Sequence, residues 1–395
     1  MKRGNGFSLI EMMVSMVILL IVVASATAAL IQAQHATDGV ALMANTQENL
    51  RAGMHFMIQD LAQAGEGIPP SGVSLPNSAA GVSAVNRPGT AGVFIQSDGV
   101  TTYTLLPVIT PGFSVGQAAK SVNAVTGAVL TGNPTDVINI LYADNTLVDV
   151  AGNSLNSFPI VQAAPAVPVC AGAINATGLT ITLATGCFKM PGTPTPLAVG
   201  NMILFTNQNG TALEYVTGVA GQTITFGAGD PAGLNQTGKP NGTVADLANA
   251  GGGFPPTTIQ RVWLITYYID SATNTRKPQL VRQVNYPNYP TVAAATNPPQ
   301  QIADCIEDLG FSFDITNSTA PAGSYTIGPG DAPAPVLPDT PAQFRAVNIF
   351  LAGRSEYPYL GSTMPQYFRN NLSTQVSLRS MSFQNQFNTS ATAAP

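Results

Sequence analysis

Charge, histidine and cysteine are all scarce in this sequence. Only 9% of the 395 residues are charged, and the formal net charge is −5. With so few basic residues, the chain lacks the cationic surface that nucleic-acid-binding proteins need. Two histidines leave little material for histidine-dependent catalysis or a histidine-ligated metal. We therefore expect no nucleic-acid partner and no histidine-based active site.

Three common catalytic and cofactor motifs are also missing. The chain contains no HExxH, GxxxxGK[ST] or GxGxxG pattern. Two groups of acidic residues are candidate calcium ligands, Asp144 with Asp149 and Asp304 with Glu307 and Asp308. Neither group has EF-hand spacing, so solvated carboxylates are the preferred interpretation. We expect no catalytic residues, no metal and no cofactor.

Proline is absent from the first 68 residues, and all 31 prolines follow. This part of the chain is therefore free to form one long helix. Phe7 to Ile31 is apolar except for Glu11 and would span roughly 37 Å as a helix, enough to cross a bilayer. Lys2 and Arg3 precede it, so the positive-inside rule places the start in the cytoplasm and the bulk of the chain outside.

Glu11 is the unusual residue of this segment. A carboxylate inside a bilayer costs about 2.5 to 3.5 kcal/mol, which favours a functional role with a charged partner. A cut between Gly6 and Phe7 would create an α-amino group four residues before Glu11. That amine would neutralise the carboxylate in the same chain or in a neighbouring helix. A secretory signal peptide is the competing interpretation, but its apolar core is shorter.

The segment Gly4 to Val23, GNGFSLIEMMVSMVILLIVV, resembles the leader and helix start of a type IV prepilin. The resemblance implies cleavage after Gly6 by a prepilin peptidase and N-methylation of Phe7. It also implies that Glu11 pairs with the amino terminus of a neighbouring subunit during assembly. The same resemblance implies an α+β, pilin-like fold, in which a long N-terminal transmembrane and amphipathic helix packs on an antiparallel β-sheet head.

The second half of the expected helix is amphipathic. Met43, Leu50, Met54, Met57 and Leu61 recur at helical spacing, which predicts a stripe packed on a globular head rather than a cofactor site. We expect the helix to run from Phe7 to about Ala64, with Gly39 and Gly53 as candidate bends. The segment Asn45 to Gly65 resembles PilW-type minor pilins and the related J-type pseudopilins of type II secretion.

The rest of the chain reads as short strands between turns rich in Gly, Pro, Asn and Thr. Charge is sparser before the GGGFPP run at Gly251 to Pro256 than after it. The expected organisation is a leader at 1–6, the helix at 7–66 (7–31 transmembrane, 32–66 amphipathic), a large β-rich insertion at 67–256 and the C-terminal sheet of the head at 257–395. Expected strands in the insertion are 93–96, 102–106, 137–142, 179–183, 201–206, 213–219 and 223–226.

Several C-terminal segments also resemble the PilW-type pattern. Val262 to Ile269 and Gln279 to Val284 predict a hairpin whose second strand carries Leu280, Val281 and Arg282. The segment that follows Gln301, IADCIEDLGFSFDI, resembles a short acidic helix leading into a strand. Two further strands are expected within 343–355, ending in Arg354 and Ser355, and within 367–383, which carries Leu378 and Arg379. Trp263, Tyr267 and Tyr268 were weighed as a binding surface, but strand alternation favours core packing.

The three cysteines allow one loop-closing disulfide. Cys170 and Cys187 could close a loop around the predicted LTITL strand, and the chain-entropy model assigns such a loop about 3 kcal/mol. Cys305 would then keep a free thiol, although its pairing with either of the others stays open.

These features together favour a non-catalytic minor type IV pilin that helps to initiate the pilus, near its tip. The expected partners are other pilin and minor pilin subunits, the prepilin peptidase, the pilus assembly platform and the bacterial inner membrane. The head would face the periplasm first and the cell surface after assembly. Two alternatives stay open, namely a pseudopilin of a type II secretion system and a pilus-tip adhesin whose insertion contacts a surface.

Overall fold

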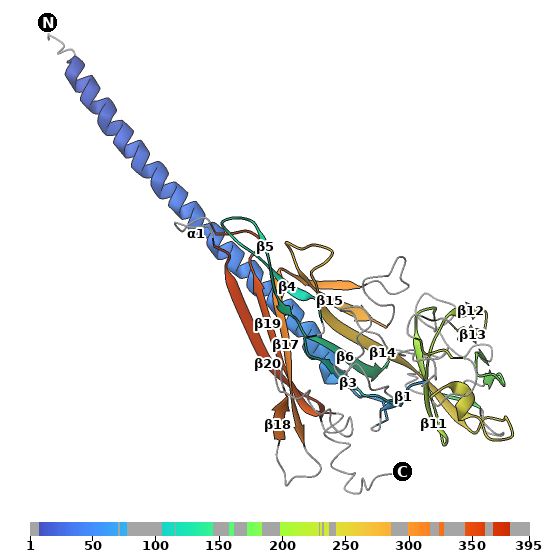
Figure 1. The fold of residues 1–395 in the computed structure, drawn as a ribbon. Coiled ribbons are helices and arrows are strands. Elements are labelled where there is room, and N and C mark those ends of the chain that lie inside the picture. Colours follow the sequence, from blue (N-terminus) through green and yellow to red (C-terminus); the bar gives the residue numbers. More distant parts are fainter. Residues whose placement is uncertain are drawn as a thin grey trace.

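The computed structural model describes the chain in segments. These are residues 8–69, 72–76, 105–114, 116–144, 158–161, 172–183, 198–228, 230, 233–236, 242–285, 299–316, 324–327, 344–359 and 366–379. The first half of the single long helix projects away from a β-rich head, and its second half lies along that head (Figure 1).

The helix α1 runs without interruption over Leu9–Gln63. Its absence of proline and its apolar then amphipathic pattern explain its length. It ends where Gly65 and Gly67 adopt left-handed backbone angles, with φ of 79° and 68°, which glycine tolerates best. The expected span from Phe7 to about Ala64 agrees with this helix within its described part.

The two glycines expected as bends serve a different purpose. Both Gly39 and Gly53 lie within the continuous α-helix. A Cβ atom at Gly39 would lie 2.8 Å from the ring of Tyr359, and one at Gly53 would lie 2.7 Å from Leu280 Cδ2. The missing side chains therefore let the head approach the helix closely.

The largest sheet has eight strands, all paired antiparallel, and is built around the long strand β14. One path through it is β11-β10-β14-β15-β16, while β6 and β7 also pair with β14, and β3 pairs with β6. Its strands are β3 (Ile109–Gly112), β6 (Val137–Ala143), β7 (Phe158–Val161), β10 (Met202–Asn207), β11 (Gly210–Tyr215), β14 (Thr257–Asp270), β15 (Gln279–Val284) and β16 (Gln300–Asp304).

A second sheet of four antiparallel strands has the order β18-β17-β19-β20. Its strands are β17 (Ile306–Thr316), β18 (Ser324–Ile327), β19 (Phe344–Arg354) and β20 (Arg369–Ser377). A third sheet has the order β12-β13-β9-β8. The smaller elements are β1 (Val73–Ser74), β2 (Leu105–Leu106), β4 (Ala118–Val122), β5 (Val129–Pro134), β8 (Gly172–Ile174), β9 (Thr180–Leu183), β12 (Gly218–Ala220), β13 (Thr223–Thr225) and the 3-10 helix η1 (Val244–Leu247).

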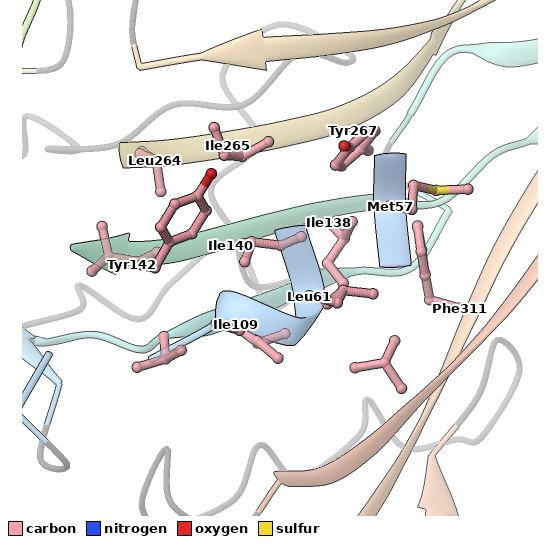
Figure 2. Close-up of a cluster of buried hydrophobic side chains, with 14 of the residues drawn as sticks. Met57, Leu61, Ile109, Ile138, Ile140, Tyr142, Leu264, Ile265, Tyr267 and Phe311 are labelled. Carbon is pink, nitrogen blue, oxygen red and sulfur yellow. The ribbon is translucent and has the colours of Figure 1, made fainter. Parts of the chain in front are cut away.

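The main core lies where α1 meets the first two sheets. Met57 and Leu61 reach in from the helix towards Ile138 and Ile140 of β6 and Phe311 of β17 (Figure 2). Each large apolar side chain buried this way contributes about 1.5 to 3 kcal/mol. A second core under the third sheet is formed by Ile181, Leu183, Ile203, Phe205, Ala212, Val216, Ile224, Phe226, Val244, Leu247 and Ile259.

Most expected strands are present where the structure describes them. Residues 137–142, 179–183, 201–206 and 223–226 correspond to β6, β9, β10 and β13, and the predicted hairpin is β14 paired with β15. The single strand expected over 213–219 is wrong, because β11 ends at Tyr215 and β12 starts at Gly218 in another sheet. Residues 93–96 and 102–104 lie outside the described residues.

The short acidic helix expected after Gln301 is also wrong. This segment forms β16 and β17, separated by Cys305, whose φ is 56°. β16 pairs with β15, and β17 pairs with β19 from Ile306 to Ile315. Long-range strand pairing therefore decides the structure of this segment, for which the family resemblance implied a helix.

The architecture is α+β and pilin-like, as predicted, with one long apolar N-terminal helix and a mostly antiparallel β head. The predicted organisation into four segments stays a prediction. In the described residues, β14 pairs with β6 and β10 of the 67–256 block and with β15 of the C-terminal block. One sheet therefore contains strands from both blocks.

Candidate functional site

The exposed first half of α1 is the first part of the candidate site. Every side chain from Ser8 to Gln34 is exposed, and this stretch is apolar and long enough to cross a membrane. The predicted processing residues Gly6 and Phe7 lie outside the described residues. This half of the helix packs against no part of the described head, so its apolar surface is available for a bilayer or for other helices.

Glu11 lies in the first turn of α1, where the helix dipole favours a negative charge. Its Oε2 accepts a hydrogen bond of 3.2 Å from the backbone N–H of Ser8. Among the residues that the structure describes, Glu11 forms no ion pair. The carboxylate can therefore still accept an ammonium group, which is the chemistry expected for an assembly contact.

A buried polar cluster fastens the other end of α1 to the head. Asp60 is 5% exposed and accepts four hydrogen bonds. Arg282 donates to it through Nε at 2.7 Å and Nη2 at 3.0 Å, while the hydroxyl groups of Tyr142 and Tyr267 donate at 3.0 and 2.5 Å. Both carboxylate oxygens therefore carry two donors, and β6, β14 and β15 all bind the same helix residue.

The electrostatics of this cluster favour neutral tyrosines. Burial, followed by the negative charge of Asp60, raises the pKa of Tyr142 and of Tyr267 well above the ordinary tyrosine value. Both hydroxyl groups therefore stay protonated and act as donors. With Arg282 supplying a positive charge beside Asp60, the cluster fixes the position of the helix on the head.

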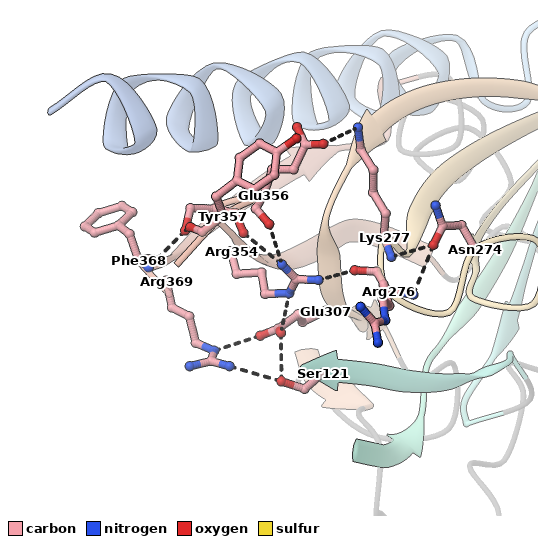
Figure 3. Close-up of polar contacts among 11 residues, drawn as sticks. Ser121, Asn274, Arg276, Lys277, Glu307, Arg354, Glu356, Tyr357, Phe368 and Arg369 are labelled. Carbon is pink, nitrogen blue, oxygen red and sulfur yellow. Dashed lines mark hydrogen bonds and ion pairs between the residues drawn. The ribbon is translucent and has the colours of Figure 1, made fainter. Parts of the chain in front are cut away.

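A second polar cluster holds the end of the head from which α1 emerges (Figure 3). Glu307, after the start of β17, pairs with Arg354 at 3.1 Å and with Arg369 at 2.9 Å. Ser121 of β4 donates to Glu307 at 2.8 Å. The Arg354 guanidinium also stacks 4.4 Å from the ring centre of Tyr367. These contacts bind β4, β17, β19 and β20 together beside the helix.

The apolar stripe and the aromatic residues pack mostly as predicted. Leu50, Met54, Met57 and Leu61 are buried against the sheets, whereas Met43 is 42% exposed and departs from the prediction. Tyr267 and Tyr268 are buried in the core and Trp263 is half-buried. The aromatic segment is therefore core packing.

Of the five candidate calcium ligands, Asp144, Asp304 and Glu307 form ion pairs with basic side chains. Asp144 is 2% exposed and forms an ion pair with Arg261, so its interpretation as a solvated carboxylate is wrong. Asp304 pairs with Lys277 at 3.0 Å, and Asp149 lies outside the described residues. In the described part of the chain, no three acidic, histidine or cysteine side chains come together as metal ligands.

The predicted disulfide cannot be placed, because Cys170 and Cys187 lie outside the described residues. Cys305 carries a free thiol and is buried. Burial raises the pKa of this thiol above its ordinary value, so the reactive thiolate is disfavoured. Cys305 is therefore a core residue of the described head.

One motif was missed by the sequence reasoning. Gly112 to Gly116 reads GFSVG, which matches the GxSxG pattern of a nucleophile elbow, and Ser114 has a left-handed φ of 52°. An elbow requires a strand, a turn and then a helix, whereas here the turn joins β3 to β4. The backbone N–H of Ser114 donates to Asp136 at 2.8 Å, and both histidines belong to α1. The motif here marks a tight turn held by Asp136.

Comparison with known proteins identifies the start of the chain. A family model described as a prokaryotic N-terminal methylation motif matches residues 1–27. No curated protein and no solved structure matches the chain. The motif, together with the long apolar helix and the β head, supports a type IV pilin-like protein. In general, such a protein is a pilin or pseudopilin subunit that is processed by a prepilin peptidase and assembles with other pilins.

In the sequence, Asp60 lies within one segment that resembles PilW-type proteins, Asn45 to Gly65, and Arg282 lies within another. The structure brings them together across a separation of 222 residues, and it adds Tyr142, which no motif indicated. The available signal was the position of Asp60 on the apolar stripe, three residues after Met57, because an acid buried there requires a cationic partner.

Proposed function

We propose that this protein is a non-catalytic minor type IV pilin of the PilW type that takes part in initiating the pilus, near its tip. The main support for the proposal is the prepilin motif at the start of a helix whose apolar first half is exposed and whose second half packs on a β-rich head. In this function the peptidase cuts after Gly6, Phe7 is methylated, and the new amine of one subunit meets Glu11 of the next.

The proposed sequence of events follows from the energetics of the helix. In the inner membrane, the bare half spans the bilayer with the start in the cytoplasm and the head in the periplasm. Assembly moves that half from lipid into a bundle of neighbouring pilin helices, where close packing and charge compensation replace lipid contact. The assembly platform supplies the movement, and the head selects the neighbours.

Substitution of Glu11 tests this function. In a strain that lacks the native gene, Glu11→Ala should leave cleavage intact but reduce the number of pili at least severalfold. Mass spectrometry of the membrane fraction should find a methylated Phe7 at the amino terminus of both forms. Glu48→Ala, an exposed acid of the same helix outside the span, is the matched control and should leave pilus number unchanged.

Two results would overturn the proposal. An intact Met1 in the mature protein would refute prepilin processing, and normal piliation with Glu11→Ala would refute the charge-compensation mechanism. If piliation is normal but secretion of folded proteins fails when the gene is deleted, the subunit is a J-type pseudopilin of type II secretion.

A further inference from the structure

The second sheet ends in a long strand that has a single partner. β20 is the last strand in the order β18-β17-β19-β20, and within the described part of the chain β19 is its only strand partner. It has nine residues, whereas the other edge strands of the described sheets have six or fewer. Figure 1 shows β20 at the side of the head, beside the second half of α1. An edge strand presents a row of unpaired backbone groups, which is a template for pairing with another chain.

One hydrogen bond at the end of β20 shows which of its backbone groups point outwards. The N–H of Leu378 donates to the carbonyl of Arg345 at 2.9 Å. Hydrogen-bonded pairs alternate with non-bonded pairs along an antiparallel ladder. In the register of β20 with β19, the even-numbered residues of β20 therefore bond to β19. The backbone groups of Ser373, Gln375 and Ser377 consequently point to the open edge, and all three residues are exposed.

Most of β20 lacks the features that protect edge strands from pairing, which are charge, proline and bulges. The strand contains no proline and no lysine, and its pairing with β19 runs through all nine residues without a bulge. Its single charged residue, Arg369, is paired with Glu307 at 2.9 Å. The N–H of Asn371 donates to Oδ1 of Asn370 at 2.9 Å. An added strand would therefore meet open backbone groups from Ser373 onwards.

A cavity of about 490 Å³ lies between this edge and α1. It is lined by Ile58 and Ala62 of the helix, by Thr374 to Ser377 of β20 and by Arg379. Side chains alternate between the two faces of a strand, so a segment paired with β20 would place every second side chain in this cavity. Backbone pairing combined with pockets for alternate side chains is how edge strands bind extended peptides. The Ile58 and Ala62 wall suits apolar side chains.

The direction of β20 argues against a second copy of this chain as the added strand. Tyr359, whose ring covers Gly39, pairs with Gln366 shortly before β20 begins. The strand ends beside Ile58 and Ala62, so it runs in the same direction as α1, away from the exposed half of the helix. Two β20 strands paired antiparallel about a two-fold axis would hold their helices in opposite directions. Such a pair cannot insert both helices into one membrane from the same side.

We propose that β20 is a strand-addition site, at which an extended segment of a different pilin subunit joins the sheet. The added segment pairs with the open backbone groups from Ser373 to Ser377 and places alternate apolar side chains in the cavity beside Ile58 and Ala62. This inference rests on the proposed function as an assembling subunit. It gives the head a contact of its own with a neighbour, in addition to the packing of the helices.

Proline at position 373 tests the site. Ser373→Pro removes an outward N–H and keeps the hydrogen bonds between β20 and β19, so the head should still fold. Ser373→Ala keeps that N–H and is the matched control. In a strain that lacks the native gene, Ser373→Pro should reduce the number of pili at least severalfold, and Ser373→Ala should leave it unchanged.

A second variant acts from the helix side of the cavity. Ala62 is exposed, and Ala62→Arg should fill the cavity without altering the strand, so it should also reduce the number of pili at least severalfold. Gln59→Arg, on another exposed position of the same helix, is its control and should have no effect. Thermal unfolding of each full-length variant in detergent micelles shows whether its head is folded. If Ser373→Pro does not fold, Ala62→Arg decides.

Hydrogen exchange measures the pairing itself. The full chain is isolated from detergent-solubilised membranes together with its bound pilin subunits and, separately, alone. In the complex, the amides of Ser373 and Gln375 should exchange at least about tenfold more slowly than in the chain alone. The amides of Leu372 and Thr374, which bond to β19, should be protected in both samples.

The outcomes separate this proposal from the proposed function. Normal piliation with Ser373→Pro and Ala62→Arg, in a strain background where Glu11→Ala loses its pili, overturns strand addition and leaves the function intact. Normal piliation with Glu11→Ala refutes the assembly mechanism on which the inference rests. Unchanged exchange at Ser373 and Gln375 in the complex overturns the proposal. Protection of these amides in the chain alone, lost on dilution, assigns the edge to a second copy and overturns it as well.

Discussion

At the scale of single residues, Glu214 is the carboxyl group whose environment conflicts most with its charge. It lies in β11, is 3% exposed, and its Oε1 accepts from the N–H of Val244 at 3.2 Å. Burial raises its pKa well above the ordinary value, the Val244 hydrogen bond opposes this, and the charge of Asp230 adds to it. The folded state therefore holds its proton more tightly than the unfolded chain does.

The sign of the resulting pH dependence follows from linkage. Folding raises the pKa of Glu214. Its contribution to the free energy of unfolding is therefore fully present when the pH is below its pKa in the unfolded chain, and it is lost as the pH rises through its pKa in the folded state. Glu214→Gln keeps the shape and removes the ionisation. We expect it to increase the free energy of unfolding at pH 8 by about 1 to 3 kcal/mol and to have little effect at pH 4.

Thermal unfolding of the full chain in detergent micelles at pH 4, 6 and 8 provides the measurement. Glu48→Gln, which alters an exposed glutamate, serves as the control and should follow the wild-type curve. An unchanged pH dependence in Glu214→Gln would show that this carboxyl group is already charged in the folded state.

At the scale of elements, the junction between α1 and the head depends on the Asp60 cluster. Asp60→Ala leaves the guanidinium of Arg282 without its partner, although Arg282 keeps some contact with solvent. Loss of one member of a buried ion pair is destabilising by about 3 to 5 kcal/mol, and the partial exposure places the expectation near the lower end. The helix should then detach locally from β6, β14 and β15.

Hydrogen exchange of residues 50–63, together with urea unfolding, measures this effect. Gln59→Ala on the exposed face of the same turn is the matched control. The double variant Asp60→Leu with Arg282→Met removes both charges but leaves the hydroxyl groups of Tyr142 and Tyr267 without their acceptor, so it should recover only part of the lost stability. Equal stability of Asp60→Ala and Gln59→Ala would contradict a docking role for the cluster.

Elements also differ in how well the sequence predicts them. The helix was predictable because its period and its lack of proline are local properties. The family resemblance implied a short helix after Gln301, yet these residues pair as strands with β15 and β19 on either side of Cys305. The pairing register of β17 with β19 depends on residues about 40 positions further along the chain. The local sequence around Cys305 therefore could not predict it.

At the scale of the whole molecule, the 67–256 block is built into the head. β14 takes β6 as a partner over Val262 to Tyr267 and β10 over Thr258 to Val262, and both partners come from this block. Without residues 67–256, β14 would lose β6 as a partner over Val262 to Tyr267 and β10 as a partner over Thr258 to Val262. The buried side chains of Ile265 and Tyr267 would then become exposed.

We therefore expect a chain lacking residues 67–256 to lose its folded head as well as any binding surface within the block. Circular dichroism and limited proteolysis of the membrane-extracted protein would show this as loss of β signal and of protease resistance. The full-length chain, prepared in the same way, is the reference. A truncated chain that keeps a protease-resistant head would show that the C-terminal strands fold independently. Because deletion of the block is expected to unfold the head, point substitutions of exposed residues test an adhesin role better than the deletion does.

The sequence by itself determined the N-terminal part of this protein: the prepilin motif, the exposed apolar half of the helix with Glu11, and the amphipathic stripe that packs on the head. These features are read from neighbouring residues and helical periodicity, so they need no tertiary information. Tertiary structure alone decided that Asp60 meets Arg282 and Tyr142, that Glu307 collects Arg354 and Arg369, and that both halves of the head share β14. Those contacts join residues up to 222 positions apart, and only the folding of the chain brings them within hydrogen-bonding distance.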